Sequence, residues 1–258
     1  MNDAPIGVFD SGVGGISVLH DLRRQLPHED VIYYADSGYC PYGGRPQTEI
    51  VERATSITEM LLTRGAKLIV VACNTATIAA VEYLRATYAV PFIGMEPAIK
   101  PAIERTRSGV VAVLATGAAL AGERFHRLLA QHTGAVRIIT QPCPGLVELV
   151  EMGDLAGPQT SALVETYTSP LLAAGVDTLV LGCTHYPFLR PLISEVVGPD
   201  VILIDTGAAV ARQTARVLER EQLLTARSRA GTVEWHTSGD PVQMERIVAQ
   251  LWGERTRA

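Results

Sequence analysis

Leu68-Ile-Val-Val-Ala-Cys73-Asn-Thr75 and Thr178-Leu-Val-Leu-Gly-Cys183-Thr-His185 are two apolar runs that each end in a cysteine followed by polar residues. The second run lies 110 residues after the first, and Gly65 and Gly175 precede the two runs at the same offset. A short, continuous apolar run is typical of a strand that is buried on both faces of a parallel sheet. The recurrence of the whole pattern predicts two copies of one structural unit.

Further pairs of segments repeat in the same order, at offsets of 105 to about 110 residues. They are residues 8–12 with 113–117, 31–36 with 136–141, and 91–96 with 201–206. Chance could produce one such match, but a whole ordered series indicates duplicated halves.

Apolar runs alternate with stretches of helical periodicity along the chain. The predicted strands are residues 6–9, 31–34, 68–72, 91–95, 110–115, 136–140, 178–182 and 201–205. The predicted helices are residues 16–25, 48–64, 76–87, 123–131, 159–173, 188–196, 208–221 and 242–252. This alternation predicts an α/β fold of two similar doubly wound parallel-sheet domains, related by pseudo-twofold symmetry, with the active site in the cleft between them. We expect residues 1–98 with 208–258 to form the first domain and residues 99–207 the second, because the final segment has no counterpart in the first repeat.

The composition limits the classes of function. The 258 residues, 47% of them hydrophobic, suffice for two buried cores, and a net charge of −5 with scattered Lys and Arg argues against nucleic acid as a partner. No apolar run approaches the roughly 20 residues of a membrane span, and the N-terminus lacks the features of a signal peptide. We therefore expect a cytoplasmic protein with free thiols at Cys40, Cys73, Cys143 and Cys183.

Polar and reactive side chains gather where the predicted strands end, and ligands of open parallel sheets bind beyond these carboxyl ends. The ends in the first half read Asp10-Ser-Gly-Val-Gly-Gly15, Asp36-Ser37, Pro41-Tyr-Gly43 and Cys73-Asn-Thr75. Those in the second half read Thr116-Gly117, Cys143-Pro144 and Cys183-Thr-His185. A substrate with at least one carboxylate is expected, because backbone N–H groups at helix N-termini favour an anion. The groups expected at such termini are those of Ser11, Gly12, Asn74 and Thr75.

Cys73 and Cys183 occupy equivalent positions in the two repeats. If the domains face each other, the two thiols approach one ligand from opposite sides. A racemase needs two such groups, because a proton leaves one face of Cα and another returns on the opposite face. A thiol has a free pKa of about 8.5, so a modest shift lets it act as acid or base near neutral pH. Asp10 and Asp36 near Cys73, and His185 near Cys183, could exchange the thiol proton.

Simpler interpretations compete for several of these residues. Cys40 and Cys143 are better interpreted as small buried hydrophobes, and we predict no metal site because the chain lacks Cys-x-x-Cys and paired histidines. The glycine-rich segment after the first strand matches neither the dinucleotide fingerprint nor the phosphate-binding loop, and it could be a tight turn. Asp36 could be a helix cap, His185 a hydrogen-bonded core histidine, and Glu151 a solvated helix residue.

Together these motifs resemble those of the glutamate racemases, within the wider aspartate/glutamate racemase superfamily. The resemblance rests on Asp10-Ser-Gly-Val-Gly-Gly15, Pro41-Tyr-Gly43, Cys73-Asn-Thr75 and Gly182-Cys-Thr-His-Tyr-Pro187, and it extends to Thr237-Ser-Gly-Asp-Pro241. It implies a cofactor-independent isomerase that interconverts L- and D-glutamate for peptidoglycan synthesis and works as a homodimer.

The resemblance also implies roles for individual residues. Cys183 deprotonates L-glutamate, and Cys73 deprotonates D-glutamate. The side chains that support the two thiols are Asp10, Asp36, Glu151 and His185. The residues that hold the substrate are Ser11, Pro41, Tyr42, Gly43, Asn74, Thr75, Thr116 and Thr184.

The chain departs from the family pattern near Thr116. Ala119 and Phe125 stand where many members carry Thr and Tyr, and Ser37 follows Asp36 where Thr is common. These changes bear on the pocket wall and on the strictness for glutamate. An aspartate racemase, or a broad amino-acid racemase with the same two cysteines, is therefore an alternative. A two-lobed binding protein for an acidic amino acid is another, although binding alone needs no thiols.

Overall fold

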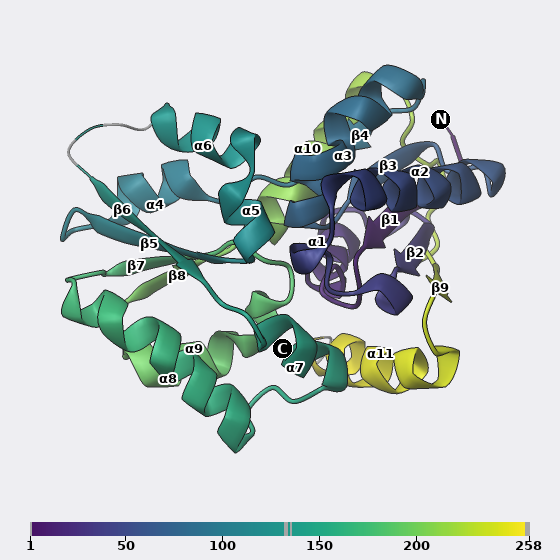
Figure 1. Ribbon diagram of the computed structural model, residues 1–258. Helices are drawn as coiled ribbons and strands as arrows, with labels where there is room; N and C mark the ends of the chain where they lie inside the picture. Colours follow the sequence, from purple (N-terminus) through teal and green to yellow (C-terminus); the bar gives the residue numbers. More distant parts are fainter. Residues whose placement is uncertain (1, 132–133, 135, 256–258) are drawn as a thin grey trace.

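Two parallel sheets, one in each of two lobes, organise the chain (Figure 1). The structure is a computed structural model, and it describes residues 2–131, 134 and 136–255. The prediction of two similar doubly wound parallel-sheet domains is confirmed, since each sheet is parallel and carries helices on both faces.

The two sheets share one strand order. The first is ordered β4-β3-β1-β2-β9 and the second β8-β7-β5-β6, so four strands correspond one to one. The first sheet contains β1 (Ile6–Asp10), β2 (Val31–Ala35), β3 (Leu68–Val71), β4 (Phe92–Ile93) and β9 (Val233–Thr237). The second contains β5 (Val110–Ala115), β6 (Arg137–Pro142), β7 (Thr178–Leu181) and β8 (Ile202–Ile204).

The register of the central strand pairs repeats as well. Ile6 of β1 lies opposite Leu68 of β3, and Val111 of β5 lies opposite Thr178 of β7. These positions are related by the offsets of 105 and 110 residues found in the sequence. Cys73 and Cys183 therefore follow strands that are equivalent in three dimensions.

Helices cover both faces of each sheet (Figure 1). In the first lobe they are α1 (Ile16–Gln25), α2 (Gln47–Thr63), α3 (Asn74–Thr87), α10 (Gly207–Arg220) and α11 (Pro241–Arg255). In the second lobe they are α4 (Ile99–Arg105), α5 (Gly117–Ala121), α6 (Glu123–Ala130), α7 (Leu146–Met152), α8 (Pro158–Ala173) and α9 (Arg190–Val197). Short 3-10 helices occur at η1 (Ser37–Tyr39), η2 (Tyr42–Gly44) and η3 (Tyr186–Leu189).

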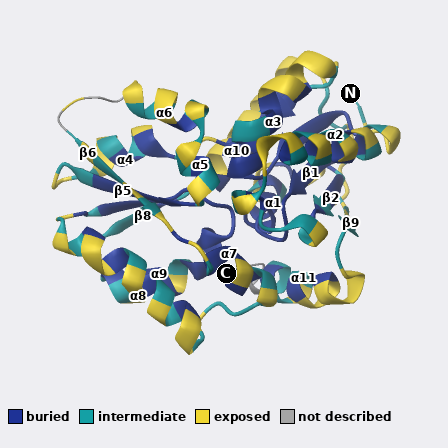
Figure 2. Ribbon diagram, viewed as in Figure 1, coloured by how far each residue is buried: buried dark blue, intermediate teal, exposed yellow. Residues whose placement is uncertain are grey.

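The core is divided by the alternation of side chains along the strands. Phe9 and Val71 pack with α2 and α3 on one face of the first sheet, and Val8 and Val70 pack with α1 and α10 on the other. The core on the face covered by α1 and α10 continues into the second lobe, where it includes Leu181. Figure 2 shows the central strands and the inward helix faces buried and the outward helix faces exposed. Burial on both faces explains why the strands read as continuous apolar runs.

The sequence missed some elements for identifiable reasons. β9 is an edge strand in which apolar and polar residues alternate, so it lacks the continuous apolar run that marked the central strands. The helices α4 and α5 are too short for a clear helical period. Val111 of β5 pairs with Ile138 of β6, which is two residues later in β6 than the repeat offset of 105 residues predicted.

The C-terminal segment lies against the first lobe. β9 pairs in parallel with β2, and α10 packs along α1. We therefore retain residues 1–98 with 208–258, and residues 99–207, as the proposed domain bounds; residues 1 and 256–258 lie outside the described part of the chain. Within the described residues, none of the helices combines the length and the apolar character needed to cross a bilayer.

Candidate active site

A small cavity lies between the lobes at the carboxyl ends of their strands. It is lined by all eight residues predicted to hold the substrate, namely Ser11, Pro41, Tyr42, Gly43, Asn74, Thr75, Thr116 and Thr184. Cys73, Cys183 and His185 also line it. Its volume of about 10 Å³ leaves room for roughly one water molecule. The two lobes are therefore closed around the two thiols.

Cys73 lies directly after β3 and forms the N-cap of α3. Its Sγ accepts a hydrogen bond from the N–H of Ala76 at 3.4 Å and donates one to Ser11 Oγ at 3.7 Å. Burial raises the pKa of the Cys73 thiol well above its usual range, and the negative charge of Asp10 raises it further. Before substrate binds, Cys73 is therefore a neutral thiol at physiological pH.

Asp10 is the last residue of β1 and is fully buried. Its carboxylate accepts hydrogen bonds from the N–H of Gly15 at 2.6 Å and from the hydroxyl of Thr184, in the other lobe, at 3.3 Å. Burial raises the pKa of Asp10, whereas the neighbouring His185 and a hydrogen bond with Cys73 lower it. Asp10 thus contacts Cys73 and also links the two lobes.

The loop after β1 corrects one prediction from the sequence. Ser11 and Gly12 do not lie at a helix N-terminus, because α1 begins only at Ile16. The N–H of Ser11 donates a hydrogen bond to the carboxylate of Asp10 at 2.8 Å, and the N–H of Val13 donates one to the carboxylate of Glu151 at 2.6 Å. These N–H groups pair with carboxylates of the protein, one buried and one partly buried, instead of facing a substrate. The same prediction is correct for the first two residues of α3.

Glycines in this loop permit the close approach of the second lobe. A Cβ atom at Gly12 would lie 1.9 Å from Glu151 Oε1, and one at Gly14 would lie 2.3 Å from His185 Nδ1. The tight-turn interpretation of the glycine-rich segment therefore omits its main role, which is to leave space for two side chains from the second lobe.

A connected series of side chains leads away from Cys183. Its Sγ lies 3.6 Å from Nδ1 of His185, and Nε2 of His185 lies 2.7 Å from Oε1 of Glu151 on α7. Burial lowers the pKa of His185, but hydrogen bonds to Cys183, Cys40 and Glu151 outweigh it and raise the pKa well above its usual value. The solvated interpretation of Glu151 is wrong, because its carboxylate is held against a buried imidazole.

Cys40 and Cys143 are free thiols, as are the other two cysteines. Cys143 is buried and donates to the carbonyl of Gln141, in agreement with its interpretation as a small buried residue. Cys40 differs, because its sulfur lies within 4.8 Å of a ring nitrogen of His185 and the residue is only partly buried. Burial raises the pKa of the Cys40 thiol to about 12. Nothing in the sequence signalled this contact with His185.

Asp36 lies outside the lining of the cavity and does not act as a side-chain helix cap. Its buried carboxylate accepts hydrogen bonds from the Tyr42 hydroxyl, from Arg53 at 2.7 and 3.0 Å, and from Ser238 at 2.6 Å. Tyr42 does line the cavity, so Asp36 bears on the site through Tyr42. The sequence did not single out Arg53, whereas Ser238 belongs to a motif that contributed to the family resemblance.

Unused polar groups are available on the wall formed by α3. Among the described residues, both side-chain polar atoms of the buried Asn74 lack a hydrogen-bond partner. Thr75 and Thr116 face each other across the lobes, with their hydroxyl oxygens 3.0 Å apart. A buried amide without partners is costly, so Asn74 is available to a ligand that supplies them.

Two of the three departures from the family pattern, Ala119 and Phe125, do not reach this wall. Ala119 of α5 and Phe125 of α6 are buried in the core of the second lobe together with residues of β5, and they do not line the cavity. The hydroxyl of Thr116 accepts a hydrogen bond from the backbone N–H of Ala119 at 3.3 Å. This contact therefore does not involve the side chain of Ala119.

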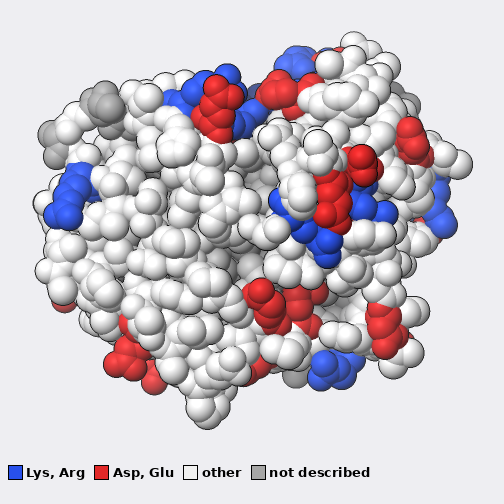
Figure 3. Space-filling model, in the orientation of Figure 1, with Lys and Arg blue, Asp and Glu red and all other residues white. Residues whose placement is uncertain are grey.

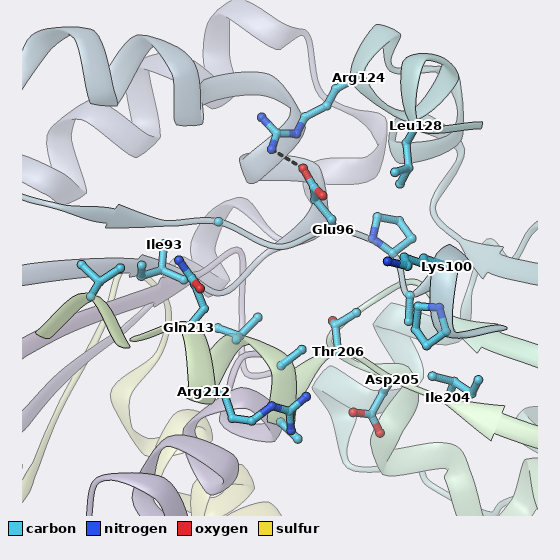
Figure 4. A pocket seen from close by; sticks show the side chains of 18 of the residues that line it. Ile93, Glu96, Lys100, Arg124, Leu128, Ile204, Asp205, Thr206, Arg212 and Gln213 are labelled. Carbon is cyan, nitrogen blue, oxygen red and sulfur yellow. Dashed lines mark hydrogen bonds and ion pairs between the residues drawn. The ribbon is translucent and has the colours of Figure 1, made fainter. Parts of the chain in front are cut away.

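A much larger cavity, of about 960 Å³, lies elsewhere between the lobes (Figure 4). Its basic side chains include Lys100, Arg124 and Arg212, and Arg124 points toward Glu96 across it (Figure 4). Neither Cys73 nor Cys183 lines this cavity, so it is distinct from the site that contains the thiols.

Comparison with known families agrees with this geometry. Residues 6–214 match the model of the Asp/Glu/Hydantoin racemase family. The chain belongs to this family. It is therefore an isomerase, and the resemblance found in its motifs is confirmed.

The similarity to individual racemases extends over nearly the whole chain. The glutamate racemase of Herpetosiphon aurantiacus is 60% identical over 247 residues, which cover 96% of this chain and 97% of that protein. The solved glutamate racemase isoform RacE1 from Bacillus anthracis is 31% identical, with a TM-score of 0.87 and coverage of 98% and 95%. The solved glutamate racemase from Francisella tularensis in complex with D-glutamate is 26% identical, with a TM-score of 0.84 and coverage of 98% and 95%.

Proposed function

We propose that the chain is a glutamate racemase that interconverts L- and D-glutamate with two thiols and without a cofactor. The observation that carries this proposal is that Cys73 and Cys183, which follow equivalent strands of two duplicated lobes, line one cavity. The identity of 60% to a protein named glutamate racemase favours glutamate as the substrate.

In the direction from L to D, Cys183 acts as the base. His185 accepts the thiol proton at Nδ1, and the carboxylate of Glu151 stabilises the imidazolium that forms. The thiolate then removes the proton from Cα. Cys73 donates its own proton to the opposite face, and its raised pKa keeps that proton in place until it is needed.

In the direction from D to L, Cys73 acts as the base. Asp10 contacts Cys73, and because burial raises the pKa of Asp10 its carboxylate is suited to accept the thiol proton. Cys183 then donates a proton to the other face. Each thiol thus has its own proton acceptor, one from each lobe.

The substrate carboxylates are held by donors at the N-terminus of α3 and by hydroxyl groups nearby. The side-chain amide of Asn74, and the hydroxyls of Thr75 and Thr116, line the cavity. The positive end of the α3 dipole favours an anion at this position. Fixed donors around the developing negative charge are worth about 3 kcal/mol each when water is excluded. Asp36 is assigned a positioning role, because it acts through Tyr42.

The family resemblance supports a wider role. We propose that the enzyme supplies D-glutamate for peptidoglycan synthesis, that it acts in the cytoplasm, and that it works as a homodimer.

Separate substitutions of the two thiols test the mechanism. Cys73→Ala and Cys183→Ala should each reduce racemisation by at least about 10²-fold, the usual contribution of one general acid–base group. Cys143→Ala is the matched control, because Cys143 is buried outside the cavity. Circular dichroism of pure L-glutamate, in buffer without pyridoxal phosphate and with a chelator, gives the rate. Undiminished racemisation by either variant would refute the two-thiol mechanism.

The substrate assignment has its own test. Incubation in deuterated water should place deuterium at Cα of glutamate and leave aspartate unlabelled. Labelling of aspartate alone would show that the chain is an aspartate racemase, and labelling of both would show a broad specificity.

A further inference from the structure

Three potential metal ligands meet at His185. One ligand atom each from Cys40, Glu151 and His185 lies within 4.8 Å of the others. Cys40 follows η1 in the first lobe, whereas Glu151 and His185 come from α7 and from the loop after β7 in the second. No sequence motif reveals this group, because its members come from three separate segments.

The two nitrogens of His185 face different partners. Nδ1 lies 3.6 Å from the sulfur of Cys183, while Nε2 lies 2.7 Å from Glu151. A cation at Nε2 would therefore take the place of the proton shared with Glu151 and leave the contact with Cys183 intact. A thiolate, an imidazole and a carboxylate are ligands that zinc binds in proteins.

The cluster is reached from outside the catalytic cavity. Cys40 and Glu151 line a separate cavity of about 250 Å³ beside α7 and α11, together with the acidic residues Glu148 and Asp240. Figure 3 shows acidic side chains gathered on this part of the surface. A concave surface lined by carboxylates raises the local concentration of cations. His185 lines the catalytic cavity, so the cluster connects the two spaces.

We propose that Cys40, Glu151 and His185 form an inhibitory site for a thiophilic divalent cation such as Zn²⁺. On binding, the Cys40 thiol releases its proton to solvent, and the single proton of the neutral His185 imidazole moves from Nε2, where the metal binds, to Nδ1. A neutral imidazole with a metal at Nε2 carries its remaining proton at Nδ1. His185 then cannot accept the proton of Cys183, and Cys183 cannot become a base.

Direct binding tests the site without reference to catalysis. Isothermal titration of the metal-free protein with Zn²⁺ should give one site per chain in the wild type and in the matched control Cys143→Ser. Cys40→Ser should weaken the affinity at least about tenfold, since even substitutions of residues around metal ligands cost 10- to 100-fold. Cys40→Ala provides a second variant, and thermal unfolding without metal verifies that each variant is folded.

The identity of the bound thiol is tested with Co²⁺ in place of Zn²⁺. The cobalt–thiolate charge-transfer band should appear in the wild type and in Cys73→Ala, and it should be absent from Cys40→Ser. Retention of the band in Cys40→Ser, or its loss in Cys73→Ala, would place the metal on the catalytic thiols and overturn the proposal.

Inhibition is measured on each variant relative to its own metal-free rate. The Zn²⁺ concentration for half inhibition should rise at least about tenfold in Cys40→Ser. Equal inhibition of this variant and the wild type would contradict the proposal. This part of the test rests on the proposed function, whereas the binding measurements do not, so failure of one is distinguishable from failure of the other.

Discussion

Replacement of Glu151 by Gln isolates the contribution of one negative charge to Cys183. The substitution preserves the size of the side chain and an oxygen that can accept the N–H of Val13. It removes the charge that faces Nε2 of His185 at 2.7 Å. A hydrogen bond to a charged group contributes about 1.5–3 kcal/mol, and one pKa unit corresponds to 1.36 kcal/mol. The pKa of His185 should therefore fall by about 1–2 units.

The kinetic consequence follows from the sign of this shift. In the wild type, burial lowers the pKa of His185, but hydrogen bonds to Cys183, Cys40 and Glu151 raise it well above its usual value. Loss of the charge of Glu151 makes the imidazolium lose its proton at a lower pH. Because His185 must be neutral before it accepts the proton of Cys183, the acidic limb of the pH profile should move down by about 1–2 units, and the weaker base should lower kcat/KM at the pH optimum by about 10- to 10²-fold.

Racemisation provides an internal control for this measurement. Enantiomers have equal free energies in water, so kcat/KM must fall equally in both directions even though Glu151 supports only one thiol. The difference between the two directions should appear in kcat and in KM when each is compared separately. Both are measured by circular dichroism, starting from pure L-glutamate and from pure D-glutamate. Glu148→Gln is the matched control, because Glu148 is exposed one turn earlier on the same helix. An unchanged pH profile in Glu151→Gln, or an equal loss of activity in Glu148→Gln, would refute the assigned role of Glu151.

Two further substitutions test the packing around the site and in the first lobe. Gly14→Ala should lower kcat/KM by about 10²-fold, because the added carbon would lie 2.3 Å from Nδ1 of His185, whereas Gly44→Ala meets nothing within 4 Å and should retain activity in the same assay. Lys67→Met should lower the free energy of unfolding in urea by about 3–5 kcal/mol, because it leaves the carboxylate of Glu29, now 2.6 Å from the ammonium group, buried without its partner.

The outcomes that would contradict these two predictions are distinct. Full activity of Gly14→Ala would mean that His185 tolerates displacement and does not act on Cys183. For Lys67→Met the matched control is Arg220→Ala, which breaks an exposed ion pair with Glu221 and should cost less than about 1 kcal/mol. Equal losses of unfolding free energy in the two variants would show that burial of the ion pair does not determine how much its removal destabilises the protein.

The location of the site could be predicted from the sequence because it depends on local and repeated features. The apolar runs fixed the strands, the repeat placed Cys73 and Cys183 on equivalent strands, and carboxyl strand ends of parallel sheets share one edge. These features brought all eight predicted binding residues to one cavity. Each of them follows a strand directly or lies in the loop after it, so no knowledge of helix packing was needed.

The contacts that tune the site could not be predicted in this way. Arg53 reaches Asp36 from the middle of α2, and Glu151 reaches His185 from α7. Cys40 reaches the same imidazole from the other lobe. Each contact depends on how a helix or loop packs against a distant segment, which hydrophobic periodicity does not specify. The family resemblance identified Asp36 and Glu151 as important, but the structure supplies the physical reason.

The size of the cavity and the bonds beside it determine how catalysis is coupled to motion. Glutamate is many times larger than the present volume of about 10 Å³, so the lobes must separate to admit it. Hydrogen bonds between the lobes join Ser17 to Thr184, Thr184 to Asp10, and Val13 to Glu151. In the proposed mechanism, Asp10 and Glu151 are the carboxylates that support the two proton transfers. Separation of the lobes therefore breaks the hydrogen bonds of both carboxylates at once. Closure of the lobes re-forms these hydrogen bonds and excludes water from the substrate in the same step.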